Sequence, residues 1–408
     1  MNYQDLRKNF PMLNNKKMQG HDLVYFDNAS TTFKPQCVID EMNKYYTEMN
    51  ANSHRGDYDL CFNMDQEVLK AREAISKFVQ CETNEVVFTS GDTMSMNMIA
   101  WGYGFKNLKK DDEIILSESE HASNLLPWFK IAELTGAKIK YVELDNGKIT
   151  CSNLRKIISS KTKIVSLAHV GNVLGYEIDI KEMTKIIHEN GAIFVVDGAQ
   201  SVPHIETNFR DWDIDFLVFS GHKMLGPTGI GCLIGKYDLL ENMDPLMMGG
   251  GDNAKFFACG TVEYLPAPAK FESGTLNLSG IMGLRKAVEY LSAIGMKNIE
   301  AREKELISYL KEQLSSNKDI EIYNLDATSA ILTFNMKGIF AQDEATLLNS
   351  KGIAVRSGQH CAKILNDYLK TPATCRASLY FYNTKEEIDY FVKTLNEKGD
   401  ILDAYFND

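Results

Sequence analysis

The sequence predicts an α/β fold, with a large domain built on a mostly parallel sheet flanked by helices and a smaller α+β domain. Between residues 86 and 234, short β-rich runs alternate with helical patterns, as in strands linked by right-handed helical crossovers. The chain has 408 residues, too many for one compact core. Near residue 291 the alternation gives way to a long amphipathic pattern, which marks a second region.

The clearest strand–helix unit lies between residues 179 and 197. Asp179 and Glu182 have the spacing of a helix capping box, and Gly191 is placed to end that helix. The apolar run 192–196 then predicts a strand buried on both faces. One apolar stripe recurs along the helix at helical spacing, formed by Ile180, Met183, Ile186 and Ile187. Similar β-rich runs predict further buried strands at residues 86–89, 113–117, 163–168 and 216–220.

The second region mixes helical and strand patterns without the regular alternation. We expect an amphipathic helix at 300–314 and a last helix at 385–398, with strands at 330–334 and 353–356. These patterns predict a large domain over residues 20–290 and a small domain over 291–408. We expect residues 1–19 to pack on the small domain.

Composition and charge exclude several classes of protein. The formal net charge of −11 argues against a nucleic-acid partner, which usually needs a basic face. Residues 1–15 lack the apolar core of a secretory signal, and no apolar run is long enough to span a bilayer. The eight cysteines form no CxxC pair and no ligand-like cluster with histidine. We therefore expect a cytoplasmic protein with free thiols, no membrane partner and no metal site.

Polar residues follow the predicted strands, at the edge where open α/β sheets bind ligands. A turn at Gly91 opens a helix, and its backbone N–H groups suit a phosphate. We expect Asp92 to cap that helix while Thr93 meets the phosphate. The other strand ends are followed by His121, Asn172, Asp197 and Lys223. Each alone has an ordinary structural explanation, but together they predict a site that bonds a phosphorylated, protonated heteroaromatic ring.

A set of short motifs extends this site over nearly the whole chain. In order they are YFDNAS at 25–30, NSHRG at 52–56, EH at 120–121, NVLG at 172–175, DGAQ at 197–200, SGHK at 220–223, FESGT at 271–275, RSGQHC at 356–361 and CRAS at 375–378. The set resembles the fold-type I, class V aminotransferase-like enzymes, and within them the Suf-type cysteine desulfurases. The resemblance implies the fold of pyridoxal-phosphate-dependent transferases, a two-fold homodimer and pyridoxal 5′-phosphate as cofactor.

The resemblance also implies a role for each motif residue. Lys223 would hold the cofactor covalently, Asp197 would pair with its pyridine N–H, and His121 would stack on the ring and move protons. Further cofactor contacts are implied for Gln200, Asn172, Asp92, Thr93, Ser220, His222 and, from the other subunit, Thr275. Contacts with the substrate, L-cysteine, are implied for Arg376, Asn172, Arg356, His54 and Arg55.

Cys361 is implied as the residue that receives sulfur from L-cysteine, so that alanine is released. The sulfur would then pass to an acceptor or scaffold protein of iron–sulfur cluster assembly. Breaking the Cβ–S bond needs a thiolate to accept the sulfur. Four positions depart from the family pattern, none with an implied covalent role: Asp92, Met94, Gly171 and Gln359.

Two other functions remain open on the sequence. A selenocysteine lyase or another class V enzyme shares the same substrate contacts, although Cys361 in its motif favours sulfur transfer over transamination. A non-catalytic protein could use the same fold to bind a partner, but intact Lys223, Asp197, His121 and Cys361 count against it. A yellow colour in the purified protein, or the formation of alanine from cysteine, would distinguish these functions.

Overall fold

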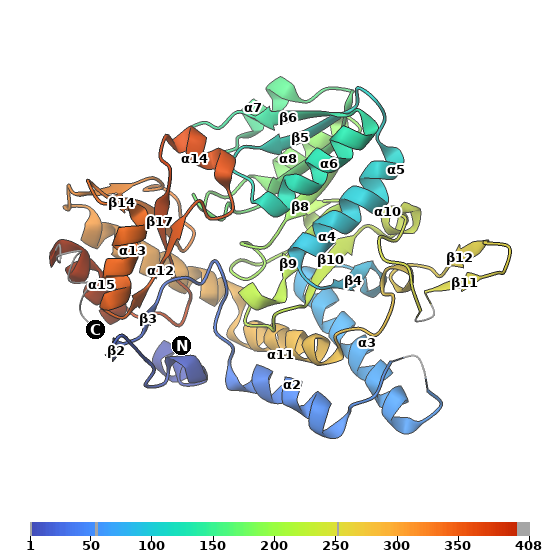
Figure 1. Cartoon of the computed structure of the whole chain (residues 1–408), viewed down its shortest axis with the longest axis horizontal. Helices are drawn as coiled ribbons and strands as arrows, with labels where there is room; N and C mark the ends of the chain where they lie inside the picture. Colours follow the sequence, from blue (N-terminus) through green and yellow to red (C-terminus); the bar gives the residue numbers. More distant parts are fainter. Residues whose placement is uncertain (1, 54–55, 251–252, 398–408) are drawn as a thin grey trace.

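A seven-stranded sheet forms the centre of the larger part of the molecule (Figure 1). The computed structural model describes residues 2–53, 56–250 and 253–397. Across the sheet the strands follow the order β4 (Val86–Thr89), β10 (Gly231–Gly235), β9 (Phe216–Ser220), β8 (Ile193–Asp197), β7 (Thr162–Ala168), β5 (Glu113–Ser117) and β6 (Lys138–Val142). Within this sheet only β10 runs antiparallel to its neighbours. The predicted strands at 86–89, 113–117, 163–168, 192–196 and 216–220 are confirmed to within one residue.

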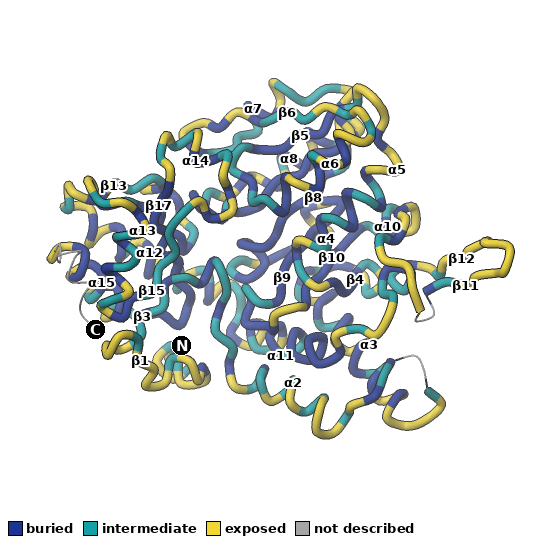
Figure 2. Tube along the Cα trace, viewed as in Figure 1, coloured by how far each residue is buried: buried dark blue, intermediate teal, exposed yellow. Residues whose placement is uncertain are grey.

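Both faces of this sheet are covered, which is why its central strands are mainly apolar. Val86 and Phe88 pack into one apolar cluster, whereas Val87 between them packs into the cluster on the other face. Figure 2 shows the resulting buried centre. The covering helices include α2 (Gln36–Glu48), α3 (Asp59–Val79), α4 (Asp92–Ile99), α6 (Leu126–Thr135), α7 (Cys151–Ile157), α8 (Ile180–Glu189) and α11 (Leu278–Ile294).

The helix predicted after Asp179 forms as the sequence indicates. The Asp179 side chain accepts a hydrogen bond from the Glu182 backbone N–H at 3.1 Å, and α8 begins there. Gly191 adopts φ 71° directly beyond the helix end, a conformation that favours glycine. The cap and the glycine therefore fix the length of the helix that leads the chain into β8.

A second, antiparallel sheet lies in the C-terminal part of the chain. Its strand order is β13 (Ile320–Ile322), β14 (Ile331–Met336), β17 (Thr374–Ser378) and β16 (Arg356–Gly358). It packs with α12 (Met296–Leu314), α13 (Ala341–Ser350) and α15 (Lys385–Glu397) around a separate apolar cluster. The helices predicted at 300–314 and 385–398 are thus found, the first beginning four residues earlier and the second followed through 397.

The N-terminal segment runs back to this C-terminal part (Figure 1). β3 (Val24–Tyr25) pairs in parallel with β15 (Ile353–Ala354), and Arg7 forms an ion pair with Glu387 at 2.5 Å. The shorter elements are α1 (Tyr3–Arg7), β1 (Lys17–Met18), β2 (His21–Asp22), α5 (Phe105–Asn107), α9 (Phe209–Trp212), α10 (Tyr237–Asn242), β11 (Ala254–Phe256), β12 (Val262–Tyr264) and α14 (Lys363–Leu369). No helix in the described ranges is long and apolar enough to cross a membrane.

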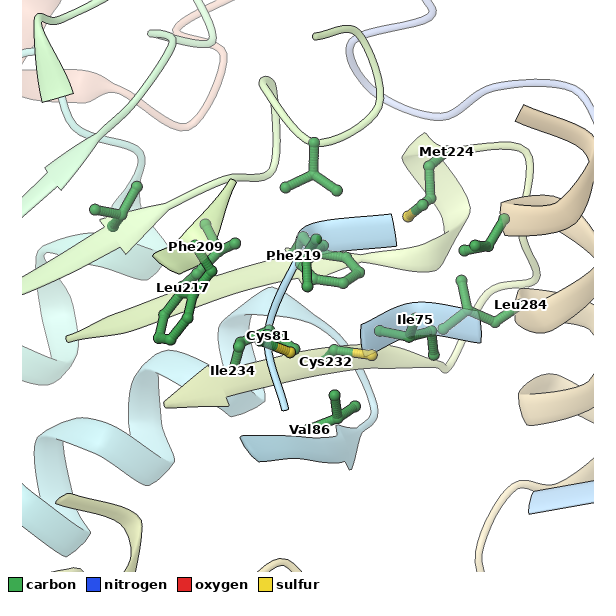
Figure 3. Packing of buried hydrophobic residues seen from close by; sticks show 14 of the residues in the cluster. Ile75, Cys81, Val86, Phe209, Leu217, Phe219, Met224, Cys232, Ile234 and Leu284 are labelled. Carbon is green, nitrogen blue, oxygen red and sulfur yellow. The ribbon is translucent and has the colours of Figure 1, made fainter. Parts of the chain in front are cut away.

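Most of the cysteines sit in structural positions. Figure 3 shows Cys81 and Cys232 among the apolar side chains of the large core, and burial raises the pKa of both thiols. All eight cysteines are unpaired, but only Cys259 and Cys361 are exposed. Cys37 and Cys151 are partly buried, and the other four are buried. Cys259 and Cys361 are therefore the two thiols most accessible to an external partner.

Candidate active site

A cavity of about 240 Å³ lies beyond the carboxyl ends of the central strands. Because β7, β8 and β9 run in parallel, the residues that follow them meet at one edge, with Asp197 paired against Ala168 and Val218. Predicted site residues from seven segments line this cavity: Asp92, Thr93, His121, Asn172, Asp197, Gln200, Ser220, His222, Lys223, Arg356 and Arg376.

Two carboxyl groups and one amine share the enclosed end of the cavity. The side chains of Asp92 and Asp197 are hydrogen-bonded to each other, and both interact with Lys223. Burial raises the pKa of both acids, most strongly that of Asp92, where the charge of Asp197 adds to the effect. Burial also lowers the pKa of the Lys223 amine, against the attraction of the two acids. The raised pKa of Asp92 favours its protonated form, which can donate a hydrogen bond to Asp197.

The prediction that Asp92 caps its own helix is wrong. The N-cap of α4 is Gly91 at φ 145°, so the helix begins at Asp92, one residue earlier than a cap at Asp92 would give. The backbone N–H of Asp92 donates to Ser220 Oγ at 2.9 Å, while one carboxyl oxygen, Oδ1, is buried without a hydrogen-bond partner. Glycine at this turn lets the chain enter the helix early, and the aspartate is directed toward Asp197 instead.

His121 is held by its own loop. The backbone N–H of Ser123 donates to His121 Nδ1 at 3.1 Å, which makes Nδ1 the acceptor and leaves the ring proton on Nε2. Burial, with the nearby charge of Lys223, lowers the pKa of His121 to about 4. The ring is therefore neutral at neutral pH. Ser123 Oγ also lies 2.7 Å from Thr93 Oγ1, which ties the histidine loop to the start of α4.

Two arginines from the antiparallel sheet also line the cavity. Arg376, on β17, is 1% exposed and donates through Nη1 to the Asn172 carbonyl at 2.8 Å. Arg356, on β16, lies directly opposite Arg376 in the strand register. Burial lowers the pKa of Arg376, the carboxylate of Asp27 opposes that shift, and Arg356 adds to it. Two guanidinium groups this close form a site for a carboxylate.

Cys361 lies beside the arginines on the loop after β16. Its side chain is exposed, and Arg356 Nη2 lies 3.4 Å from its Sγ. The loop backbone is fixed from the large domain, since Ala122 N–H donates to the Cys361 carbonyl at 2.8 Å and Asn172 Nδ2 to the His360 carbonyl at 2.9 Å. Cys375, in contrast, is fully buried on β17, and burial raises the pKa of its thiol.

One predicted site residue in the described part of the chain, Thr275, lies apart from this cavity. Thr275 is exposed, accepts a hydrogen bond from Asn52 Nδ2 at 3.2 Å, and does not line the cavity. His54 and Arg55 lie outside the described residues. Sequence reasoning also missed two polar cavity residues, Ser30 and Ser123. Ser30 ends the YFDNAS motif, directly after a short apolar run, and that position was the available signal.

Comparison with known proteins gives a consistent result. The family model "Aminotransferase class-V" matches residues 24–391. A probable cysteine desulfurase of Halalkalibacterium halodurans is 42% identical over all of both chains, and one of Staphylococcus aureus is 39% identical over 98% of this chain and 97% of its own. Among solved structures, the cysteine desulfurase CsdA of Escherichia coli has a TM-score of 0.90 at 33% identity, covering 97% of this chain and 98% of its own. The cysteine desulfurase of Thermococcus onnurineus has a TM-score of 0.91 at 35% identity, covering 96% and 97%.

Asp92→Asn should make the cofactor-free protein more stable, by a margin that grows with pH. The folded protein keeps the Asp92 proton, which the unfolded chain releases above roughly pH 4, so stability falls as pH rises toward the raised pKa. Asparagine keeps the size of the side chain and does not titrate. We expect the difference in unfolding free energy to widen as pH rises from about 5 toward the raised pKa of Asp92, by up to about 1.4 kcal/mol per pH unit.

Urea denaturation of both proteins across this pH range measures the difference. The exposed residue Asp145 provides a matched control, and Asp145→Asn should follow the native protein at every pH. A constant difference between Asp92→Asn and the native protein would show that Asp92 is ionised in the folded state.

Proposed function

The chain belongs to the class-V aminotransferase family, and we propose that it is a cysteine desulfurase, a pyridoxal 5′-phosphate enzyme that takes sulfur from L-cysteine. The observation that carries the proposal is the position of Cys361. Its exposed thiol lies within 3.4 Å of an arginine that also lines the cavity containing Lys223. An aminotransferase needs the lysine and the arginine but has no use for a thiol at that point.

The residues around the cavity fit this cofactor. The buried carboxylate of Asp197 suits a pyridine N–H, and the oxygen Oε1 of Gln200 is buried without a partner. Ser220, His222 and Thr93 gather at the start of α4, where a helix N-terminus favours a phosphate. When bound, the cofactor supplies an electron-withdrawing ring that stabilises negative charge at the substrate Cα.

Three residues of the chain would bind the cofactor and transfer protons. Lys223 presents an amine whose pKa is lowered by burial, so that it can lose its proton and act as a nucleophile and base. His121 is neutral, and it can accept or donate a proton beside the ring. Asp197 would keep the pyridine nitrogen protonated.

Cys361 would carry out the sulfur transfer. Its thiolate attacks the sulfur of the bound L-cysteine, so the S–S bond forms as the Cβ–S bond breaks. The electron pair of the broken bond passes to Cβ, which takes up a proton and becomes the methyl group of L-alanine. L-Alanine is then released. The product on the enzyme is a Cys361 persulfide, and its exposed position suits transfer to another protein.

We further propose a homodimer in which Thr275 completes the phosphate site of the partner. Thr275 is exposed in the single chain. The β11–β12 hairpin projects from the body of the molecule (Figure 1) and carries uncovered apolar side chains, Phe256 at 81% and Phe257 at 50% exposed. An apolar surface of this kind is typical of a protein interface.

The location and the acceptor are also part of the proposal. Eight unpaired cysteines fit a reducing compartment, so the cytoplasm is the expected site of action. The Suf-type motifs favour a scaffold or acceptor protein of iron–sulfur cluster assembly as the recipient of the sulfur. Alanine release measured with and without candidate acceptor proteins tests that assignment, because a true acceptor should accelerate it.

Lys223→Ala should abolish covalent attachment of the cofactor and reduce turnover of L-cysteine at least about a hundredfold. Borohydride reduction of the native protein, followed by peptide mass spectrometry, should locate the cofactor on Lys223. Lys34 is the lysine most able to compete for the cofactor. Burial lowers the pKa of its amine to about 8, and its Nζ lies near the site, where it donates to the His222 carbonyl at 2.9 Å. Attachment to Lys34 would overturn the assignment.

Cys361→Ala should separate binding from sulfur transfer. Binding depends on Lys223 and the arginines, so L-cysteine should still shift the cofactor spectrum, while alanine release should fall at least about a hundredfold. Cys259→Ala, at the other exposed cysteine, and Cys375→Ala, at a buried one, should both keep the native rate. In the native protein, brief exposure to cysteine should add one sulfur atom to Cys361. An adduct on Cys375 would contradict the mechanism.

Mixed dimers test whether Thr275 acts across subunits. Thr275→Ala alone should bind the cofactor about tenfold more weakly, the usual loss for one hydrogen bond to a charged group. In a mixed dimer with Lys223→Ala, one site combines native Lys223 with native Thr275, so that site should regain native affinity in equilibrium dialysis. A cofactor-loaded monomer by light scattering, or a mixed dimer with no tight site, would contradict the proposal.

A further inference from the structure

Ser30 joins the two arginines of the cavity through one hydroxyl group. Ser30 Oγ accepts hydrogen bonds from Arg356 Nη1 at 3.0 Å and from Arg376 Nη2 at 2.9 Å. It donates its proton to Asp27 Oδ1 at 2.7 Å. A hydroxyl has one donor and two acceptor positions, so these three contacts use the full capacity of Ser30.

The direction of these bonds matters. Because the Ser30 hydroxyl donates its hydrogen bond to Asp27, both lone pairs of Ser30 Oγ face guanidinium donors. The two arginines would otherwise repel each other, and Arg356 does lower the pKa of Arg376, after the larger effect of burial. Ser30 supplies the shared acceptor that keeps the two cations side by side at the cavity wall.

The same hydroxyl also affects the nucleophile. Arg356 is bound to Ser30 through Nη1, and its other terminal nitrogen, Nη2, lies 3.4 Å from Cys361 Sγ. Holding one nitrogen of a planar guanidinium fixes the direction of the other. The orientation of Arg356 toward Cys361 therefore depends on its contact with Ser30.

The loop that carries Ser30 is held independently of this side chain. Ala29 N–H donates to Ser378 Oγ at 2.9 Å, and Gln200 Nε2 donates to the Ala29 carbonyl at 2.7 Å. Beyond Ser30, Thr32 N–H donates to the His222 carbonyl at 3.0 Å. Removing the Ser30 hydroxyl should thus change the arginines without displacing the loop.

We propose that Ser30 is a positioning residue for the carboxylate of the amino-acid substrate, acting through Arg356 and Arg376. The inference rests on the proposed function, because it assigns those arginines to an amino acid's carboxylate. It predicts a loss confined to ligands with a carboxylate. The amine end of the ligand, which meets Lys223 and the cofactor, should bind as before.

The experiment compares L-alanine with L-alaninamide, which lacks the carboxylate. Both are titrated into the cofactor-loaded Cys361→Ala protein, where no sulfur transfer interferes, and dissociation constants are read from the cofactor spectrum. Adding Ser30→Ala should raise the constant for L-alanine about tenfold, as expected for a lost charged hydrogen bond, and that for L-alaninamide less than about twofold. In the Cys361-containing enzyme, KM for L-cysteine should rise about tenfold with a smaller change in kcat.

Matched variants exclude a merely structural effect. Ser119→Ala removes a half-buried serine that bonds Ser117 Oγ rather than the arginines, and it should change neither constant. Ser30→Thr keeps a hydroxyl and should restore L-alanine binding to within about threefold of native. If Ser30→Ala does not fold, as judged by circular dichroism, Ser30→Cys is measured in its place, with the same selective loss expected.

The outcomes separate this inference from the proposed function. Equal losses for both ligands, or no loss for L-alanine, overturn the role of Ser30 and leave the proposed function untouched. If neither ligand alters the spectrum of the protein with native Ser30, the proposed function fails and this inference fails with it.

Discussion

The buried guanidinium of Arg376 is the interaction on which assembly of the site depends. It is 1% exposed, and a cation removed from water must be paired or hydrogen-bonded to be tolerated. Its partners come from distant parts of the chain: the Asn172 carbonyl after β7, and Asp27 with Ser30 in the N-terminal segment. Satisfying this one charge therefore brings together the N-terminal segment, the parallel sheet and the C-terminal sheet, which are the three parts that form the cavity wall.

The charged groups of the cavity form two sets. Lys223, Asp197 and Asp92 form one set, in which burial shifts each group toward its neutral form and a hydrogen bond joins the two acids. Arg356 and Arg376 line the cavity as well, and Asp27 is the carboxylate partner of Arg376. His121 is neutral, with a pKa lowered by burial and by the cations around it. An amino acid fits this division, because its amine can approach Lys223 while its carboxylate meets the arginines.

Much of the fold and the site could be predicted from the sequence, because both follow local rules. A strand buried on both faces is a continuous apolar run in the sequence, so β4, β5, β7, β8 and β9 could be predicted. The residues that follow these strands meet at one edge of the sheet. β6 was missed since it is an edge strand with charged Lys138 and Lys140, and β10 since glycines bound it at 231 and 235. The role of Ser30 could not be found, because it depends on two arginines more than 320 residues away. Asp92 was misassigned because the turn at Gly91 starts the helix one residue earlier than the cap pattern predicts.

A sulfur-transfer site must satisfy two opposed requirements, and the position of Cys361 meets both. The chemistry on the substrate needs an enclosed cavity, because charges interact strongly only where water is excluded. Delivery to another protein needs an accessible sulfur. Hydrogen bonds from the Ala122 backbone and the Asn172 side chain fix the Cys361 loop against the cavity, while the side chain of Cys361 is exposed. Cys375, on the neighbouring strand, is fully buried and meets neither requirement. From the loop after β16, one thiol can therefore reach both the enclosed site and the protein surface.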